Sequence, residues 1–140
     1  MRPMSEAKPF IDSNIVLYLL SADATKADRA EAVMAAGGVV SVQVLNEVMS
    51  VMRRKLGMTW AETDEVLAGL RAACTVEPLT TQTHDTGRHL AQRYGLSVYD
   101  AMIVSAAMLA GCDRFYSEDM QHGLLLEGQL QICNPFIAPS

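Results

Sequence analysis

Near its amino end the chain contains the stretch Phe10-Ile11-Asp12-Ser13-Asn14, in which an apolar pair is followed at once by a carboxylate, a hydroxyl and an amide. A second apolar run, residues 15–20, comes directly after it. This pattern predicts a short buried strand that ends at Asp12 and turns into a helix. Because ligands bind at the carboxyl ends of strands in open α/β sheets, Asp12 is a candidate site residue.

Apolar runs typical of strands alternate with helical patterns along the rest of the chain. Further strands are predicted at 39–42, 75–78, 114–116 and 130–133. Helices are predicted at 15–20, 24–36, 44–56, 83–94 and 99–109, and a further one is capped at Thr59 and runs to about Ala73. We therefore expect a three-layer α/β/α fold with a central, mostly parallel sheet of about five strands. No internal repeat or linker is visible, so residues 1–140 are expected to form a single domain, with 1–8 as a short N-terminal extension.

Composition and charge narrow the class of protein. Half of the residues are hydrophobic and 19% are charged, which favours a packed domain over disorder. The net charge of −5 disfavours a simple polyphosphate-binding surface, which is usually basic. An acidic protein can still act on nucleic acid if its carboxylates hold cations that meet the phosphate.

The cysteines and the apolar runs indicate the compartment. The 3 cysteines are odd in number and have no C-x-x-C spacing, so we expect free thiols in a reducing environment. No apolar run approaches the roughly 20 residues of a membrane span, and residues 1–8 lack the apolar core of a signal peptide. A soluble cytoplasmic protein with no membrane partner is the expectation.

A few acidic residues stand outside the polar stretches that hold most of the 16 acids of this chain. They follow a predicted strand, open an apolar helix, or share a helix face with apolar residues, and they are Asp12, Glu47, Asp100 and Asp119. Each alone has a structural explanation: an Asx turn for Asp12, a capping or first-turn acid for Asp100, or an arginine pair for Glu47.

Taken together, these acids predict a metal site. Strand ends and helix starts gather at one edge of a parallel sheet, and Glu47 can reach that edge from its helix. Carboxylates held close together repel one another, which raises their pKa values unless a cation offsets the charge. Because the set contains only hard oxygen ligands, the expected cofactor is Mg²⁺ or Mn²⁺.

The motifs around these acids resemble those of a known family. Ile11-Asp12-Ser13-Asn14, Asn46-Glu47, Tyr99-Asp100-Ala101 and Ser117-Glu118-Asp119 resemble, in order, the four acidic motifs of PIN-domain ribonucleases. The sequence at residues 116–123 is similar to one that recurs in VapC-type toxins, the branch of this family found in toxin–antitoxin pairs. The resemblance covers nearly the whole chain.

The resemblance implies a PIN-like fold and a metal-dependent endoribonuclease that hydrolyses RNA phosphodiester bonds. It implies that the acids named above bind one or two Mg²⁺ or Mn²⁺ ions, with Ser13, Asn14 and Ser117 in support. Either Glu118 or Asp119 matches the fourth acid, and the residue two after the serine, Asp119, is favoured. The toxin branch also implies a small antitoxin partner and a homodimer.

Basic residues near these motifs are candidate RNA contacts, although a solvated helix end is the better explanation of any one of them. They are Arg53, Arg54, Lys55, Arg88 and Arg93, with His122 beside the last motif.

Other readings of the same residues stay open or are excluded. The chain could be a non-catalytic PIN-like binding domain, or an RNA-processing nuclease without an antitoxin. A haloacid-type phosphatase would need an acid where Asn14 stands, and a receiver domain would need adjacent acids before its central aspartate. The sequence also lacks the glycine-rich G-x-x-x-x-G-K-[ST] loop that would indicate a nucleotide-binding site.

Overall fold

A computed structural model describes residues 7–137 of the chain. Its helices are α1 (Ser13–Leu17), α2 (Ala24–Ala35), α3 (Val42–Arg54), α4 (Trp60–Ala73), α5 (Thr81–Tyr94) and α6 (Val98–Leu109), with a 3-10 helix η1 (Tyr18–Leu20) after α1. Its strands are β1 (Phe10–Ile11), β2 (Gly38–Ser41), β3 (Cys74–Glu77), β4 (Arg114–Tyr116), β5 (Leu125–Leu126) and β6 (Leu130–Cys133). The predicted N-terminal extension lies outside the described residues, apart from Ala7 and Lys8.

The strands form one six-stranded sheet in the order β3-β2-β1-β4-β6-β5. Every pairing is parallel except that of β5 with β6. The expected mostly parallel sheet is therefore confirmed, but the expected number of strands was one too low. The missed strand β5 is two residues long and holds its place by pairing with β6, so a pattern search has almost nothing to detect.

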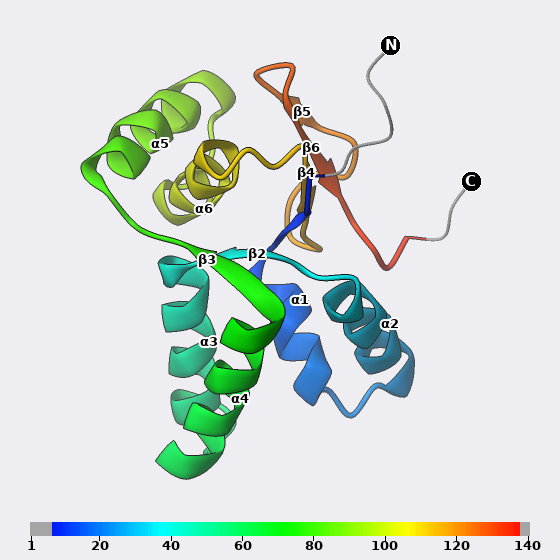
Figure 1. The fold of residues 1–140 in the computed structure, drawn as a ribbon. Coiled ribbons are helices and arrows are strands. Elements are labelled where there is room, and N and C mark those ends of the chain that lie inside the picture. The colour runs from blue at the N-terminus through cyan, green and yellow to red at the C-terminus, as the bar shows by residue number, and fades with distance from the viewer. Residues whose placement is uncertain (1–6, 138–140) are drawn as a thin grey trace.

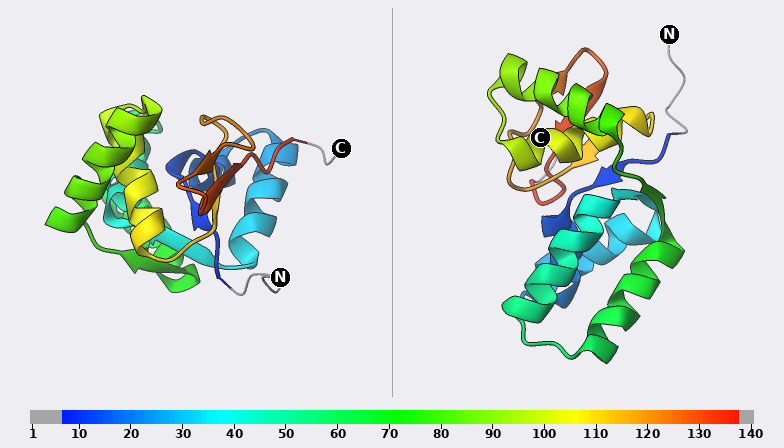
Figure 2. Two further views of the ribbon diagram at one scale, coloured as in Figure 1. Left: turned by 90° about the horizontal axis from the view of Figure 1, so that it is seen from above. Right: turned by 90° about the vertical axis from the view of Figure 1, so that its left-hand side faces the viewer.

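Helices cover both faces of the sheet (Figures 1 and 2). The pair α5 and α6 lies on one side, and α1 to α4 lie on the other. The central strand β1 is fully buried, and Phe10 stacks on Phe115 of β4 with ring centroids 5.2 Å apart. The core is therefore built around the stretch that precedes Asp12.

Capping side chains explain why several helices begin earlier than the apolar pattern predicts. Ser41, Thr80 and Ser97 each accept a hydrogen bond from the backbone amide three residues on, at the start of α3, α5 and α6. A helix begins directly after its cap and before its first buried residue. For the same reason β2 ends at Ser41, one residue before the predicted end. The Thr59–Glu62 capping box at α4 matches the prediction.

The predicted helix at 15–20 is in fact two segments. Asp12 is the N-cap, so α1 begins at Ser13, and the chain tightens into η1 from Tyr18 onward. This places Asp12, Ser13 and Asn14 on the first turn, at the carboxyl end of β1.

The remaining expectations concern the thiols and the membrane. All three cysteines are free, and Cys74 and Cys112 are buried. Within residues 7–137, no helix combines the length and the apolar character needed to cross a membrane.

Candidate active site

Asp12 lies where the chain order of the sheet reverses. From β1 the chain continues to β2 and β3 on one side, whereas β4 lies on the other side. The backbone amide of Asp12 donates to the carbonyl of Tyr116 at 3.0 Å, which brings the end of β4 alongside the end of β1. Such a switch point opens a crevice at the strand ends, where α/β proteins bind ligands.

The carboxylate of Asp12 is buried and well supplied with donors. Its side chain is only 5% exposed. Oδ1 accepts a hydrogen bond of 2.7 Å from the Ser13 amide, and Oδ2 accepts one of 2.9 Å from the Ser117 hydroxyl. Donors from two separate elements therefore fix both oxygens.

The pKa of Asp12 shows what surrounds it. This pKa is raised from its usual 3.8 to about 6, and burial is the largest cause. Hydrogen bonds from Ser117 and Ser13 act in the opposite direction, and the negative charges of Glu47 and Asp100 contribute to the increase. The structure therefore gathers these three acids, although they are far apart in the sequence.

Glu47 and Asp100 reach this cluster from different helices. The Ser13 hydroxyl donates to Oε2 of Glu47 on α3 at 2.9 Å. Asp100 lies in the first turn of α6, and its backbone amide donates to Oγ of the cap Ser97 at 3.2 Å.

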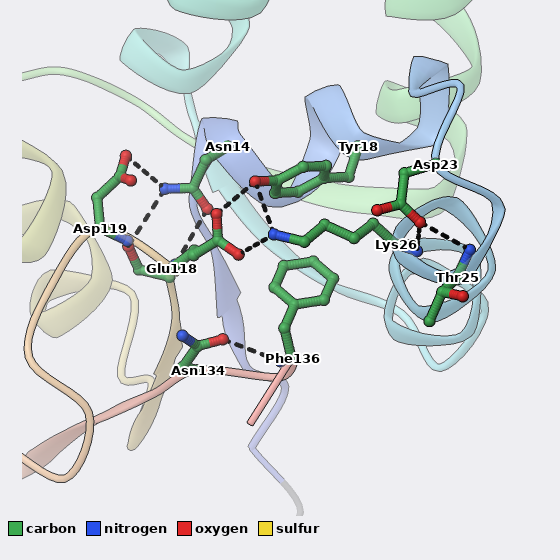
Figure 3. Close-up of polar contacts among 10 residues, drawn as sticks. Asn14, Tyr18, Asp23, Thr25, Lys26, Glu118, Asp119, Asn134 and Phe136 are labelled. Carbon is green, nitrogen blue, oxygen red and sulfur yellow. Dashed lines mark hydrogen bonds and ion pairs between the residues drawn. The ribbon is translucent and has the colours of Figure 1, made fainter. Parts of the chain in front are cut away.

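Asn14 joins the fourth acidic motif to the first. Its side-chain Nδ2 donates to Oδ2 of Asp119 at 3.0 Å and to Oδ2 of Asp12 at 3.2 Å. Its Oδ1 accepts from the backbone amide of Glu118 at 3.2 Å. Figure 3 shows Asn14 lying between the two neighbouring acids of this loop.

The two candidates for the fourth acid have different surroundings. Glu118 points toward Tyr18 and Lys26, away from Asp119 (Figure 3). It accepts a hydrogen bond from the Tyr18 hydroxyl and pairs with Lys26 Nζ at 2.5 Å, and the hydrogen bond from Lys26 lowers its pKa. Asp119 is exposed; its side chain accepts a hydrogen bond from Asn14, and its backbone amide donates to Oγ of Ser117. This arrangement favours Asp119 as the site acid.

Sequence reasoning missed the group formed by Tyr18, Lys26 and Glu118. Lys26 Nζ also lies 5.0 Å from the ring centre of Phe136, near the carboxyl end of the described chain. We find no sequence signal for this group, because its members come from three segments that only the fold brings together.

The donor set is suited to a hard cation that keeps its own water. Carboxylate and hydroxyl oxygens are the ligands that Mg²⁺ and Mn²⁺ prefer. Within residues 7–137, no three acidic, histidine or cysteine side chains converge closely enough to form a complete metal cage. Mg²⁺ does not need such a cage, because it commonly binds through one or two carboxylates and several waters.

Most of the candidate RNA contacts have partners within the protein. Arg53 donates to the carbonyl of Met58 at 2.6 Å and stacks on Trp60. Arg93 pairs with Glu127 at 2.7 Å.

Of three further candidates, two have partners within the protein and the third caps a helix. Arg88 lies near Asp85, with 3.6 Å between their charged atoms. His122 Nδ1 accepts from the amide of Asn134 at 2.9 Å. Lys55 is the exposed C-cap of α3. Arg54 differs from all of these, because it lines a cleft that also contains Glu47.

An α/β fold with carboxylates gathered at its switch point defines a class of acidic-site proteins, and comparison with known proteins identifies the family. The family model for the PIN domain matches residues 10–122. The chain therefore belongs to the PIN-domain family, which confirms the resemblance seen in its motifs. No curated protein sequence matches it significantly.

Solved structures share the fold at low sequence identity. A toxin–antitoxin complex from Klebsiella pneumoniae aligns with a TM-score of 0.71 and 18% identity, covering 91% of this chain and 98% of that one. VapC20 from Mycobacterium tuberculosis, described as a sarcin–ricin loop cleaving toxin, aligns with a TM-score of 0.63 and 19% identity over 79% of this chain and 88% of that one. VapBC2 from Rickettsia felis, bound to a DNA fragment from its promoter, aligns with a TM-score of 0.57 and 15% identity. That alignment covers 79% of this chain and 86% of that one.

Proposed function

We propose that this protein is a metal-dependent endoribonuclease and the toxin of a toxin–antitoxin pair. The observation that carries the proposal is the buried carboxylate of Asp12, which is held by Ser117 and Ser13 while Glu47 and Asp100 add repulsion. A protein gains no stability from gathering like charges around a buried acid. A bound cation would offset that repulsion.

The residues that would hold Mg²⁺ or Mn²⁺ are Asp12 and Asp100, with Glu47 and Asp119 contributing directly or through water. When bound, the ion supplies Lewis-acid chemistry, which acidifies a water molecule and neutralises charge on the attacked phosphate. The set needs no protein nucleophile.

The neighbouring polar side chains orient the acids. Ser117 and the Ser13 amide fix the rotation of the Asp12 carboxylate, and the Ser13 hydroxyl directs Glu47. Asn14 sets the position of Asp119. Outer hydrogen bonds of this kind determine ligand geometry, so each of these residues is expected to influence metal affinity.

The proposed toxin role rests on the structural neighbours, one of which is described as a toxin–antitoxin complex and another as a toxin. On this chain, a shallow apolar groove of about 300 Å³ lies between α1–η1 and α3 and is lined in part by Leu17, Leu20, Val51 and Leu56. It offers an amphipathic segment of an antitoxin an apolar contact surface. The homodimer expected from the family stays a prediction, which light scattering of the purified protein would check.

The decisive experiment is cleavage of structured RNAs with and without Mg²⁺ or Mn²⁺. Asp100→Asn keeps the side-chain shape and removes one charge, so we expect it to lower the rate more than about 100-fold. Asp64→Asn, on the exposed face of α4, is the matched control and should cleave normally.

The same samples test metal binding independently of cleavage. Mg²⁺ should raise the unfolding temperature of the wild type and of Asp64→Asn, but less that of Asp100→Asn. No cleavage together with no metal-induced stabilisation would leave the non-catalytic binding domain as the better account.

The toxin role has a separate test. Co-expression with the product of a small neighbouring reading frame should suppress both the growth defect and the cleavage. If no neighbouring product does so while the purified protein cleaves RNA, the chain is an RNA-processing nuclease instead.

A further inference from the structure

An open cleft of about 610 Å³ adjoins the acidic cluster. It is lined by Gln43, Asn46, Glu47, Ser50, Arg54, Leu79 and Tyr99. Glu47 belongs both to this cleft and to the group around Asp12, so the cleft continues directly from the candidate active site. The mechanism proposed above assigns no role to its other side chains.

Tyr99 is the most exposed large hydrophobic side chain of this cleft. It follows Val98 at the start of α6, precedes Asp100, and is 71% exposed. The other tyrosine hydroxyls are engaged: that of Tyr18 by Glu118, that of Tyr94 by the amide of Glu127, and that of Tyr116 by Arg114. Within residues 7–137, the Tyr99 hydroxyl has no such partner. Packing and hydrogen bonding within the described part of the protein therefore do not explain why a tyrosine stands at this exposed position.

Arg54 is the cation of the cleft and is equally free of partners among the described residues. It is exposed, whereas its neighbour Arg53 donates to a backbone carbonyl and stacks on Trp60. Its place in the last turn of α3 suits the helix dipole, but that effect fixes no direction for the side chain. In a protein of net charge −5, a free guanidinium beside Glu47 offers a contact for an anion that approaches the acids.

We propose that this cleft binds an unpaired nucleotide of the RNA beside the cleaved bond, with the base stacked on Tyr99 and a phosphate held by Arg54. The inference rests on the proposed ribonuclease function and adds that the substrate is single-stranded at this position. Every base has a face that can stack on an aromatic ring, but only an unpaired base can leave its helix to do so.

The remaining lining residues suit the same ligand. Gln43, Asn46 and Ser50 supply amide and hydroxyl groups for base edges or a ribose 2′-hydroxyl, and Leu79 adds an apolar wall. A nucleotide uses each part of this lining, because its base can stack on Tyr99 while its phosphate pairs with Arg54, the cation of the cleft.

The test is RNA binding without metal, so that no cleavage intervenes. Fluorescence anisotropy at low salt in EDTA would measure the Kd of labelled single-stranded oligouridylate and oligoadenylate. Tyr99→Ala should raise Kd about 5- to 150-fold, the range for one stacked base, while Tyr99→Phe should stay within about twofold of the wild type. Arg54→Ala should raise Kd and reduce the slope of log Kd against log salt by about 0.7, the value for one phosphate of a single strand.

Matched controls come from equivalent surface positions. Val98→Ala removes an exposed side chain from the same turn as Tyr99, and Arg71→Ala removes an exposed arginine from the last turn of α4. Neither residue lines the cleft, so neither should change Kd more than about twofold. Circular dichroism would verify that each variant is folded.

Three results would overturn the inference. The first is that the wild type does not bind single-stranded RNA, and the second is that Tyr99→Ala binds it as tightly as the wild type. The third is that the cleft variants no longer bind a purified antitoxin but still bind RNA with the affinity of the wild type. The binding test does not depend on cleavage. Protein that neither cleaves RNA nor is stabilised by Mg²⁺, but shows Tyr99-dependent binding, would refute the proposed nuclease and keep the subsite. Protein that cleaves RNA in a metal-dependent way, but binds it equally well without Tyr99, would keep the nuclease and refute the subsite.

Discussion

The side-chain amide of Asn14 donates a hydrogen bond of 3.0 Å to Asp119, a residue 105 positions further along the chain. The same nitrogen lies 3.2 Å from Oδ2 of Asp12. One neutral donor therefore lies between the first and the last acid of the site and lowers their mutual repulsion.

Replacing this donor by a carboxylate should disrupt the site. Asn14→Asp puts a third negative charge between Asp12 and Asp119, and we expect metal affinity and cleavage rate to fall about 10- to 100-fold. Gln129→Glu makes the same change of amide to acid in an exposed turn and is the control. Equal activity of Asn14→Asp and wild type, measured over a Mg²⁺ titration, would contradict the role assigned to Asn14.

Asp12 should make the metal-free protein less stable as the pH rises. Its pKa is about 6 in the folded protein against 3.8 in the unfolded chain, so the folded state binds more protons between these values. Stability from this residue is therefore present below about pH 4 and is lost as the pH rises to about 6. The shift corresponds to at most ~3 kcal/mol of unfolding free energy.

The measurement compares wild type with Asp12→Asn, which cannot titrate, by urea unfolding in EDTA. The wild type should lose stability relative to the variant across this pH range, and added Mg²⁺ should restore it at neutral pH. If the difference in unfolding free energy between the two proteins does not change with pH, burial does not raise the pKa of Asp12.

Lys26 should act on the site through Glu118. Lys26→Met removes the cation that pairs with Glu118 and frees the loop that carries Ser117 and Asp119. We expect half-maximal cleavage to need severalfold more Mg²⁺, up to about tenfold, while the Kd for RNA in EDTA stays unchanged. Lys26→Arg should recover most of the effect, and Arg71→Met, at the exposed end of α4, should have none. If the Kd for RNA in EDTA rose by as large a factor as the Mg²⁺ concentration for half-maximal cleavage, Lys26 would be a direct RNA contact instead.

Two glycines should respond oppositely to alanine. A Cβ at Gly38 would lie 2.5 Å from Cδ1 of Ile11 and 2.9 Å from the carbonyl of Pro9, in the fully buried pairing of β1 with β2. Gly38→Ala should cost about 1–3 kcal/mol in thermal or urea unfolding. A Cβ at Gly69 in α4 meets nothing within 4 Å, so Gly69→Ala should stabilise the helix by up to ~1 kcal/mol. Equal effects would mean that β1 and β2 can separate at little cost.

Local patterns were sufficient for most of the fold. Strands β4 and β6 were predicted to the residue, because each is a short apolar run bounded by turn residues. The helices were found by periodicity, and their starts were misplaced where Ser41, Thr80 and Ser97 cap them before the first buried residue. The two-residue strand β5 was missed because it depends on β6 for its existence.

The candidate site also has a part that the sequence predicted, the acids, and a part that it did not, the contacts of the basic side chains. The four acids were selected from the sequence because each stands at a strand end, a helix start or on an apolar helix face. Most of the cationic residues chosen as RNA contacts turned out to have internal partners, such as Glu127 for Arg93. Proximity in sequence to an acidic motif carries no information on where a long side chain points.

By itself, the sequence determined the order of every strand and helix except β5, the cap at Thr59 and the acids that follow β1 and β4. These depend on backbone preferences and burial within a few neighbouring residues. Only the tertiary structure decided that Asn14 contacts Asp119, that Glu118 turns away to Lys26, and that Tyr99 and Arg54 share a cleft with Glu47. The contacts of Asn14 with Asp119 and of Glu118 with Lys26 follow from β4 pairing with β1 across about a hundred residues of chain, and a pairing of that range leaves no periodic trace in the sequence.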